Sequence, residues 1–251
     1  MCCFSRPVQS VSATNIFARP AENTRQFLAY SMTLRAKENL AMVLPLPVQA
    51  GSGEKAVTFI DLKNYAAFFT DLRSGFPMPI PMSSSLATRG DAPSKLKLEV
   101  IQVGSFEASY VPTVNDFSRL DERFRLPPGT WDKLPAYRDY GFAVFKLKPG
   151  AATVHPMAFS FPRADKSTLF FPTVHIHDRR VHGTARFDHA LYCQTGPEEQ
   201  LALTGWVESK SPAGSFMKAD QAKGLIDAER HCYLKELHGN LPNRDTLLQR
   251  F

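Results

Sequence analysis

Short segments in which apolar and polar residues alternate constrain the fold of this chain more than any other feature. At 95–100 charged residues alternate with leucine and valine, and at 145–148 two apolar residues alternate with two lysines. A period of two residues is typical of a strand that buries one face. Other apolar, β-branched or aromatic runs predict strands at 15–18, 26–33, 40–44, 55–60, 142–148, 157–161, 167–177, 187–193 and 204–208. We therefore expect an α+β fold that is mainly antiparallel β, with a few peripheral helices.

Two stripes of aromatic and leucine side chains have helical spacing. After Asp61, a candidate N-cap, the positions i, i+3, i+4 and i+7 are filled by Tyr65, Phe68, Phe69 and Leu72. A shorter stripe consists of Phe117, Leu120 and Phe124. Each stripe predicts a helix that buries one face.

A third helix is expected over about 212–230, because Ser211 can cap it and Pro212 suits its first position. Gly224 weakens this helix. The segment 74–94 is rich in proline, methionine and serine, which predicts an irregular loop or a lid. The chain is expected to form a single α+β domain over 1–251, and the alternative is two lobes divided at 74–94.

Composition excludes several classes of protein. Hydrophobic residues make up 43% and charged residues 22% of the 251, as in ordinary globular proteins, so a disordered chain or a collagen-like fibre is excluded. No run of about 18 apolar residues occurs, so no membrane association is expected. The net charge is +6, but lysine and arginine are scattered, so specific nucleic-acid binding is not expected. The partner is left unknown.

The four cysteines predict a reducing compartment. Cys2, Cys3, Cys193 and Cys232 do not form a C-x-x-C motif, and four cysteines in a chain of this length are no disulfide framework. The N-terminus has no charged start followed by an apolar core, so no secretion signal is visible. We expect a cytoplasmic protein.

Histidines are concentrated in one segment. Four of the seven lie within 15 residues, at His175, His177, His182 and His189. On a strand His175 and His177 share a face. A turn at 178–180 would let an antiparallel strand bring His182 and His189 back toward the first pair.

Imidazole binds transition metals well, so this segment predicts a site for zinc, iron or copper. Its ligands would be His175, His177, His182, His189 and Asp178, and His155 or Cys193 could complete the set. Two alternatives stay open. One is a metal-free His–Asp cluster that acts in acid–base catalysis, and the other is a set of ordinary surface or half-buried histidines.

The first residues suggest a different chemistry. Removal of Met1 would leave Cys2 with a thiol and a free α-amine that can serve as its base. The start, Met-Cys-Cys-Phe-Ser, resembles that of N-terminal-nucleophile hydrolases, and 15–19 resembles their next strand. This resemblance implies amide hydrolysis with Cys2 as the catalytic nucleophile. The alternative is a thiol pair without a catalytic role.

The order of several apolar motifs resembles an uncharacterised bacterial family that is known only as a domain of unknown function. The motifs are Cys2-Cys3-Phe4, Pro7-Val8, Leu44-Pro45-Leu46-Pro47-Val48, Val103-Gly104-Ser105-Phe106-Glu107 and 141–147. Members of that family begin with a secretion signal, which is not visible here. The resemblance implies a β-rich fold and brings no known activity.

Motifs of common enzyme classes are missing from the sequence. It has no G-x-G-x-x-G, no phosphate-binding G-x-x-x-x-G-K-[ST], no H-E-x-x-H and no G-x-S-x-G. Whether the protein is an enzyme is therefore left open. Three hypotheses remain: a metal-binding protein centred on His175 and His177, an amide hydrolase using Cys2, and a non-enzymatic interaction domain that offers the segment 74–94 as an apolar surface.

Overall fold

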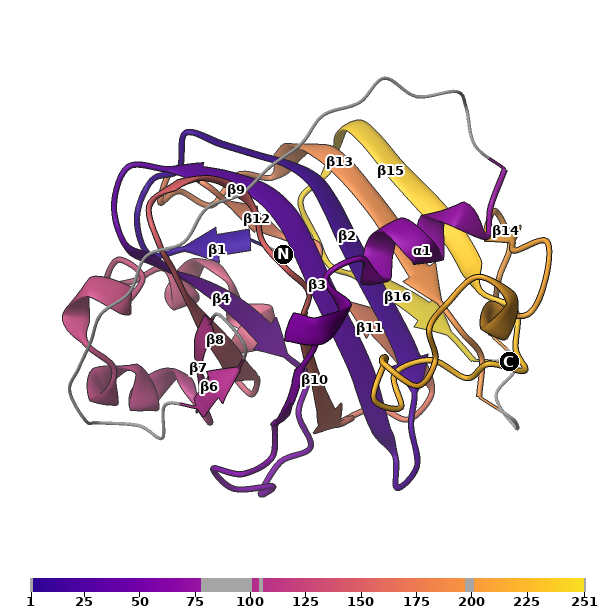
Figure 1. The fold of residues 1–251 in the computed structure, drawn as a ribbon. Helices are drawn as coiled ribbons and strands as arrows, with labels where there is room; N and C mark the ends of the chain where they lie inside the picture. The colour runs from indigo at the N-terminus through magenta and orange to yellow at the C-terminus, as the bar shows by residue number, and fades with distance from the viewer. Residues whose placement is uncertain (1, 78–100, 104–105, 197–200, 251) are drawn as a thin grey trace.

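Two large β-sheets and one small sheet make up most of the structure (Figure 1). The computed structural model describes residues 2–77, 101–103, 106–196 and 201–250. The six-stranded sheet has the order β12 (His175–Ile176), β1 (Cys2–Phe4), β4 (Leu40–Leu46), β8 (Gly141–Leu147), β7 (Phe106–Val111) and β6 (Ile101–Val103). The eight-stranded sheet has the order β14 (Val207–Glu208), β15 (Tyr233–Pro242), β13 (Thr184–Cys193), β2 (Ser10–Pro20), β3 (Arg25–Ala36), β10 (Met157–Pro162) and β5 (Thr58–Asp61), and β9 (Gly150–Thr153) also pairs with β3. The two-stranded sheet consists of β11 (Thr168–Phe171) and β16 (Thr246–Gln249).

The two large sheets are mixed rather than purely antiparallel. Most neighbouring strands run antiparallel, but β1 pairs in parallel with β12, and β2 pairs in parallel with β13. The expectation of a mostly β fold with few helices is confirmed, and its antiparallel part needs this correction. A parallel pair joins segments that are far apart in the chain, and alternation within one segment carries no information about such a pair.

The eight-stranded sheet is buried on both faces, which gives the structure three layers. Residues such as Ile16 and Leu28 belong to a core shared with the six-stranded sheet. Their neighbours Phe17 and Ala29 point the other way, into a second core. That core is covered by α1 (Phe68–Ser74), whose Phe68 ring lies 5.8 Å from that of Phe17, and by residues between 213 and 232.

The first helical stripe forms helices and the second forms 3₁₀ turns. After Asp61, whose carboxylate accepts the amide hydrogen of Lys63, the chain enters η1 (Lys63–Tyr65) and then α1. All four apolar residues of that stripe are buried in the second core. The stripe at 117–124 lies on η2 (Val114–Arg119) and η3 (Glu122–Phe124), which are followed by η4 (Trp131–Lys133) and η5 (Pro135–Tyr137).

The helix predicted over 212–230 is wrong. The segment contains only the 3₁₀ helix η6 (Ala213–Ser215), followed by turns. Lys223 and Gly224 adopt left-handed backbone angles, with φ of 50° and 82°, which end any right-handed helix there. The amide of Gly214 donates to the carbonyl of Ala228 at 2.8 Å, so the segment folds back on itself. Its apolar residues still reach the second core.

Most predicted strands are confirmed, often with longer bounds. The run 167–177 divides into β11 and β12, and 204–208 contributes only the two residues of β14. The predicted strand at 95–100 and most of the segment 74–94 lie outside the described residues. In the part of the chain that is described, no helix has the length and apolar character needed to span a membrane.

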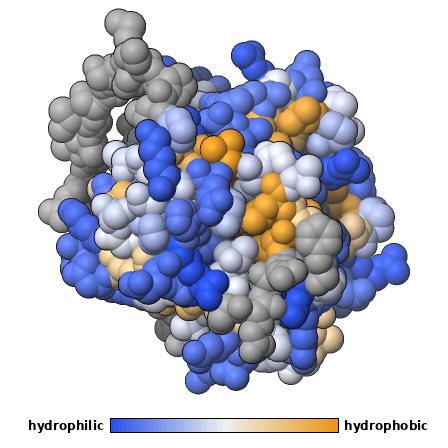
Figure 2. All heavy atoms as spheres, turned by 90° about the vertical axis from the view of Figure 1, so that its right-hand side faces the viewer, coloured by the Kyte–Doolittle hydropathy of each residue, from blue (hydrophilic) through white to orange (hydrophobic). Residues whose placement is uncertain are grey.

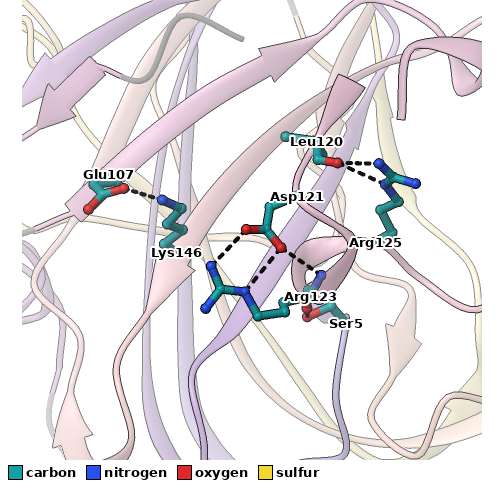
Figure 3. A network of polar contacts seen from close by, with 7 residues as sticks. All are labelled: Ser5, Glu107, Leu120, Asp121, Arg123, Arg125 and Lys146. Carbon is teal, nitrogen blue, oxygen red and sulfur yellow. Dashed lines mark hydrogen bonds and ion pairs between the residues drawn. The ribbon is translucent and has the colours of Figure 1, made fainter. Parts of the chain in front are cut away.

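A polar network ties the 3₁₀ segment to the six-stranded sheet (Figure 3). Asp121 pairs with Arg123 at 2.7 Å, and Glu107 on β7 pairs with Lys146 on β8. The buried hydroxyl of Ser5 donates to the carbonyl of Arg123 and accepts the amide hydrogen of Ala41. Ser5 therefore links η3 to β4 inside the protein, while the ion pairs lie at the surface.

The face that carries the C-terminal strands is mixed in character. Figure 2 shows separate hydrophobic patches among hydrophilic residues. Among the described residues, the exposed large hydrophobic side chains are Val207 and Leu247, at 50% and 51% exposure. Single exposed apolar residues of this kind are ordinary on protein surfaces.

Candidate functional site

Three of the predicted histidines meet where the two large sheets contact each other. His175 lies on β12, at the edge of the six-stranded sheet, and His177 follows two residues later. His189 lies on β13 of the eight-stranded sheet. The Nε2 atoms of His175 and His189 are 3.1 Å apart, and the ring centroids of His175 and His177 are 4.9 Å apart. The predicted common side for His175 and His177 is therefore confirmed.

The route by which these histidines meet differs from the predicted hairpin. The turn at 178–180 is present, with Arg179 in a left-handed conformation and Asp178 accepting the amide hydrogen of Arg180. However, β12 pairs with β1, and β13 pairs with β2 and β15. His175 thus belongs to the six-stranded sheet and His189 to the eight-stranded sheet. The strands β2 and β15 occupy the two edges of β13, so β12 and β13 do not pair as a hairpin.

Burial makes the three imidazoles neutral at physiological pH. His175 and His189 are only 7% and 2% exposed. Desolvation, reinforced by neighbouring positive charge, lowers the pKa of His175 to about 3, of His177 to about 4 and of His189 to about 2. Phe187 packs on His175, with ring centroids 4.6 Å apart, and Phe4 packs on His177 at 5.6 Å. A neutral imidazole keeps a nitrogen lone pair, which is the form that binds a metal.

The hydrogen bonds assign protons within the cluster. Nδ1 of His189 accepts the amide hydrogen of Asp188 at 3.3 Å, so its proton resides on Nε2. That Nε2–H then donates to Nε2 of His175. Nε2 of His177 is buried and has no hydrogen-bond partner among the described residues. A buried nitrogen without a partner is costly, and a ligand would satisfy it.

The histidines lie at the base of a fork in the eight-stranded sheet. β2 and β13 pair only from Thr14 and His189 onward, whereas residues 10–12 pair with β3 and residues 184–188 pair with β15. The register of β2 shifts between Ser12 and Asn15, and Ala13 has a φ of 49°. This bulge turns β2 away from β13. The amide of Ala13 still donates to Asp188 at 2.9 Å, which bridges the two arms at the point where pairing stops.

A cavity of about 820 Å³ occupies this fork. Its size is in the range of small-molecule sites. The walls come from β2, β13, β15 and the histidine segment, and the lining residues are Gln9, Ser10, Val11, Ser12, Thr14, His175, His177, Arg186, Phe187, Asp188, His189, His238 and Gly239. The structure thus opens the histidine cluster to a space whose lining surface is mostly apolar, with Arg186 and Asp188 as charged members of its wall.

The other predicted ligands lie elsewhere. His182 and Asp178 bind each other at 2.9 Å, and both are more than half exposed, outside the residues that line the cavity. The ring of His155 packs on Phe106 at 4.1 Å, and Cys193 is fully buried in the first core. Cys2 is placed by its backbone, which pairs with His175, and its role as a nucleophile stays a prediction.

Sequence reasoning did not find the groups that surround the histidines. Asp188 and His238 face each other across β13 and β15, with Oδ1 and Nδ1 3.6 Å apart at the mouth of the fork. Asn243 and Asp245, between β15 and β16, bind the backbone of residues 173–175. These contacts join parts of the chain about 70 residues apart. In the sequence, the turn-like composition of 238–243 is a local signal, but it does not indicate which segment these residues bind.

Two imidazole nitrogens of the cluster have a spacing that can be compared with that of two ligands on one metal ion. Two nitrogens on one tetrahedral zinc ion lie about 3.3 Å apart, since each bond is about 2.0 Å long. The 3.1 Å between His175 and His189 is close to that spacing. Within residues 2–77, 101–103, 106–196 and 201–250, no group of three His, Cys, Asp or Glu is already placed to hold a metal. Metal binding would therefore require His189 to move its proton to Nδ1 and His177 to turn its ring.

No protein-family model matches the chain, and no curated protein matches it. Among solved structures, the chain is similar to baculovirus P35, with 13% identity and a TM-score of 0.48 over 96% of this chain and 97% of that chain. It is also similar to P35 in a complex with caspase-8, with 12% identity and a TM-score of 0.46 over 95% of this chain and 96% of that chain. These values say nothing about what this chain binds.

Proposed function

We propose that this protein binds a divalent transition metal through His175 and His189, with His177 as a third ligand. The observation that carries the proposal is the 3.1 Å distance between two buried, neutral Nε2 atoms beside a third nitrogen that has no hydrogen bond. Zinc, iron and copper all accept such a donor set. The cavity leaves room for water or a small molecule at the remaining coordination positions.

Metal content of protein purified without chelator tests this proposal. We expect close to one zinc or cobalt per chain after reconstitution, and loss of that metal in a His175→Ala/His189→Ala variant. The matched control is His182→Ala/His238→Ala, which removes two exposed histidines and should leave the metal content unchanged. Cobalt adds a visible absorption band that reports nitrogen ligands. Wild-type protein that takes up neither metal would overturn the proposal.

A second candidate function is partner binding without catalysis. At the fork, residues 10–13 of β2 and 184–188 of β13 each leave one strand edge without a ladder partner among the described residues. Open edges of this kind accept an extended peptide as an added strand. This arrangement supports an interaction domain whose partner inserts a strand into the fork.

Filling the fork tests the second candidate. Ser12→Trp should block an added strand, while Ser118→Trp on an exposed 3₁₀ segment serves as control. Caspase-8, which is present in one of the P35 structures, is a defined protein to use as the probe in this assay. Capture that is lost in Ser12→Trp but kept in the histidine variants would favour partner binding over a metal site.

A further inference from the structure

The side chain of Asn243 joins the two segments that carry the metal-site histidines. Its Oδ1 accepts the amide hydrogen of His175 at 2.7 Å, and its Nδ2 donates to the carbonyl oxygens of His175 and His182, both at 2.9 Å. Its own amide donates to the carbonyl of Gly183 at 2.9 Å. One residue therefore binds the start and the end of the loop between β12 and β13.

This amide takes the place of a missing strand. β12 is at the edge of its sheet, with β1 on one side. On the other side Asn243 binds both the N–H and the C=O of His175, as the residue of a neighbouring strand would. The backbone of His175 is thus fixed from both sides, and its imidazole is aimed at His189.

The same contacts fix where β13 begins. Gly183 directly precedes β13, and His189 lies five residues after the first residue of that strand, Thr184. Because Asn243 binds His175, His182 and Gly183 together, the distance between the two imidazoles depends on it. A metal site tolerates only about 0.5 Å of displacement in its ligands, so this dependence matters for affinity.

Two other side-chain amides make similar paired contacts and provide a comparison. Gln26 binds the N–H and C=O of Phe170, and Gln194 binds those of Asp227. Both hold segments without a cluster histidine, so they stabilise the fold in the same manner but not at the site. Gln194 is fully buried, which makes its loss at least as damaging to the fold as that of Asn243.

We propose that Asn243 is a positioning residue that sets the spacing of His175 and His189. The expected consequence is that Asn243 determines metal affinity, and this consequence rests on the proposed metal site. Loss of groups that orient metal ligands weakens binding by about 10–100-fold.

The test compares Asn243→Asp with Gln194→Glu. Each change keeps the shape of the side chain and replaces donated hydrogen bonds with repulsion between a carboxyl oxygen and a backbone carbonyl. In metal-free protein, nitrogen NMR of the imidazoles reports the contact between His175 and His189. We expect Asn243→Asp to change both signals and to weaken cobalt binding at least tenfold, and Gln194→Glu to leave both readouts near wild type. Asn243→Ser, which keeps one donor, replaces Asn243→Asp if that variant does not fold.

Unchanged imidazole signals in the Asn243 variant would overturn the positioning role. Equal weakening of cobalt binding by Gln194→Glu would also overturn it, because the effect would then be general destabilisation. If wild-type protein binds no cobalt, the proposed function fails, and the NMR comparison still decides whether Asn243 sets the histidine spacing.

Discussion

The histidine cluster at the fork and the ion-pair network around η3 are both polar, but one is buried and neutral and the other is exposed and charged. The pKa of His189 falls to about 2 because burial removes water from the ring and so disfavours its charged form. The pKa of Asp121 also falls to about 2, because hydrogen bonds from Arg123 favour its charged form. A lowered pKa thus marks an uncharged group in one region and a charged group in the other.

The two regions therefore differ in what stabilises them. Water screens the exposed pairs in Figure 3, so their removal changes stability little. The histidine cluster depends on buried groups that hold the surrounding backbone, and their partners have no water to replace them. Loss of a buried group should cost several times more than loss of an exposed ion pair.

Asp245 should show the largest effect. Its half-buried carboxylate accepts hydrogen bonds from Tyr137 and from the amides of Thr173 and Val174, and desolvation raises its pKa. Asp245→Ala leaves these donors unsatisfied beside His175, so we expect the free energy of unfolding to fall by about 4 kcal/mol. Urea unfolding measures this, and Asp245→Asn, which keeps an acceptor oxygen, should lose less. A loss below about 1 kcal/mol in Asp245→Ala would contradict the comparison.

Acidification should be the next largest effect. The folded-state pKa values of His175 and His189 lie below the ordinary 6.5, so the unfolded chain binds more protons as the pH falls below 6.5. The stability that the two neutral imidazoles contribute is complete above pH 6.5. It is lost progressively as the pH falls toward their folded-state pKa values. Between pH 6.5 and about 5, these two groups should lower the unfolding free energy of metal-free protein by about 3 kcal/mol.

Chemical denaturation at a series of pH values measures that slope. His189→Leu should flatten it, because one of the three imidazoles with a lowered pKa is gone. His182→Asn should leave it unchanged, since His182 is more than half exposed. A slope in His189→Leu equal to that of wild type would show that the cluster is not its source.

Ser5 should fall between the two regions. It belongs to the network in Figure 3 but is only 2% exposed, and it binds Ala41 and Arg123. Ser5→Ala leaves the buried amide of Ala41 without this acceptor, so we expect a loss of about 1–2 kcal/mol. Thermal unfolding would detect it as a lower Tm. No change would mean that burial does not separate the two regions.

The smallest effect is expected for Glu107→Gln. Glu107 and Lys146 are each about one-third exposed and form a cross-strand ion pair. Removing the charge should change the unfolding free energy by less than about 0.5 kcal/mol, and salt should reduce that difference further. Urea titrations with and without added salt provide the measurement. A loss of unfolding free energy as large as that of Ser5→Ala would contradict the distinction between buried and exposed polar groups.

Sequence patterns predicted local structure well where apolar residues recur at the period of a helix or a strand. The stripe after Asp61 and the alternation around Phe145 both led to the observed elements. The helix over 212–230 was wrong because capping signals at Ser211 and Pro212 say nothing about the left-handed angles at 223–224. Tertiary contacts with the second core determine how that segment folds.

The candidate site was predictable only in part for the same reason. The H-x-H spacing placed His175 and His177 on one side, and His189 was among the expected ligands. Asn243 and Asp245 were not foreseen, because nothing in the sequence near 175 indicates which distant residue will bind its backbone. The mixed sheets have the same origin, since parallel pairs join distant segments.

The parallel pairing of β1 with β12 and of β2 with β13 has a consequence for the order of folding. During synthesis the first two strands emerge early, but the segments that complete their sheets, 175–176 and 189–193, follow only after most of the chain. Contacts that span so much of the sequence make folding slow, and the open edges stay accessible until then. His175 and His189 can meet only at this late stage. Ligand binding at the fork would therefore distinguish molecules that have finished folding from those still waiting on the ribosome.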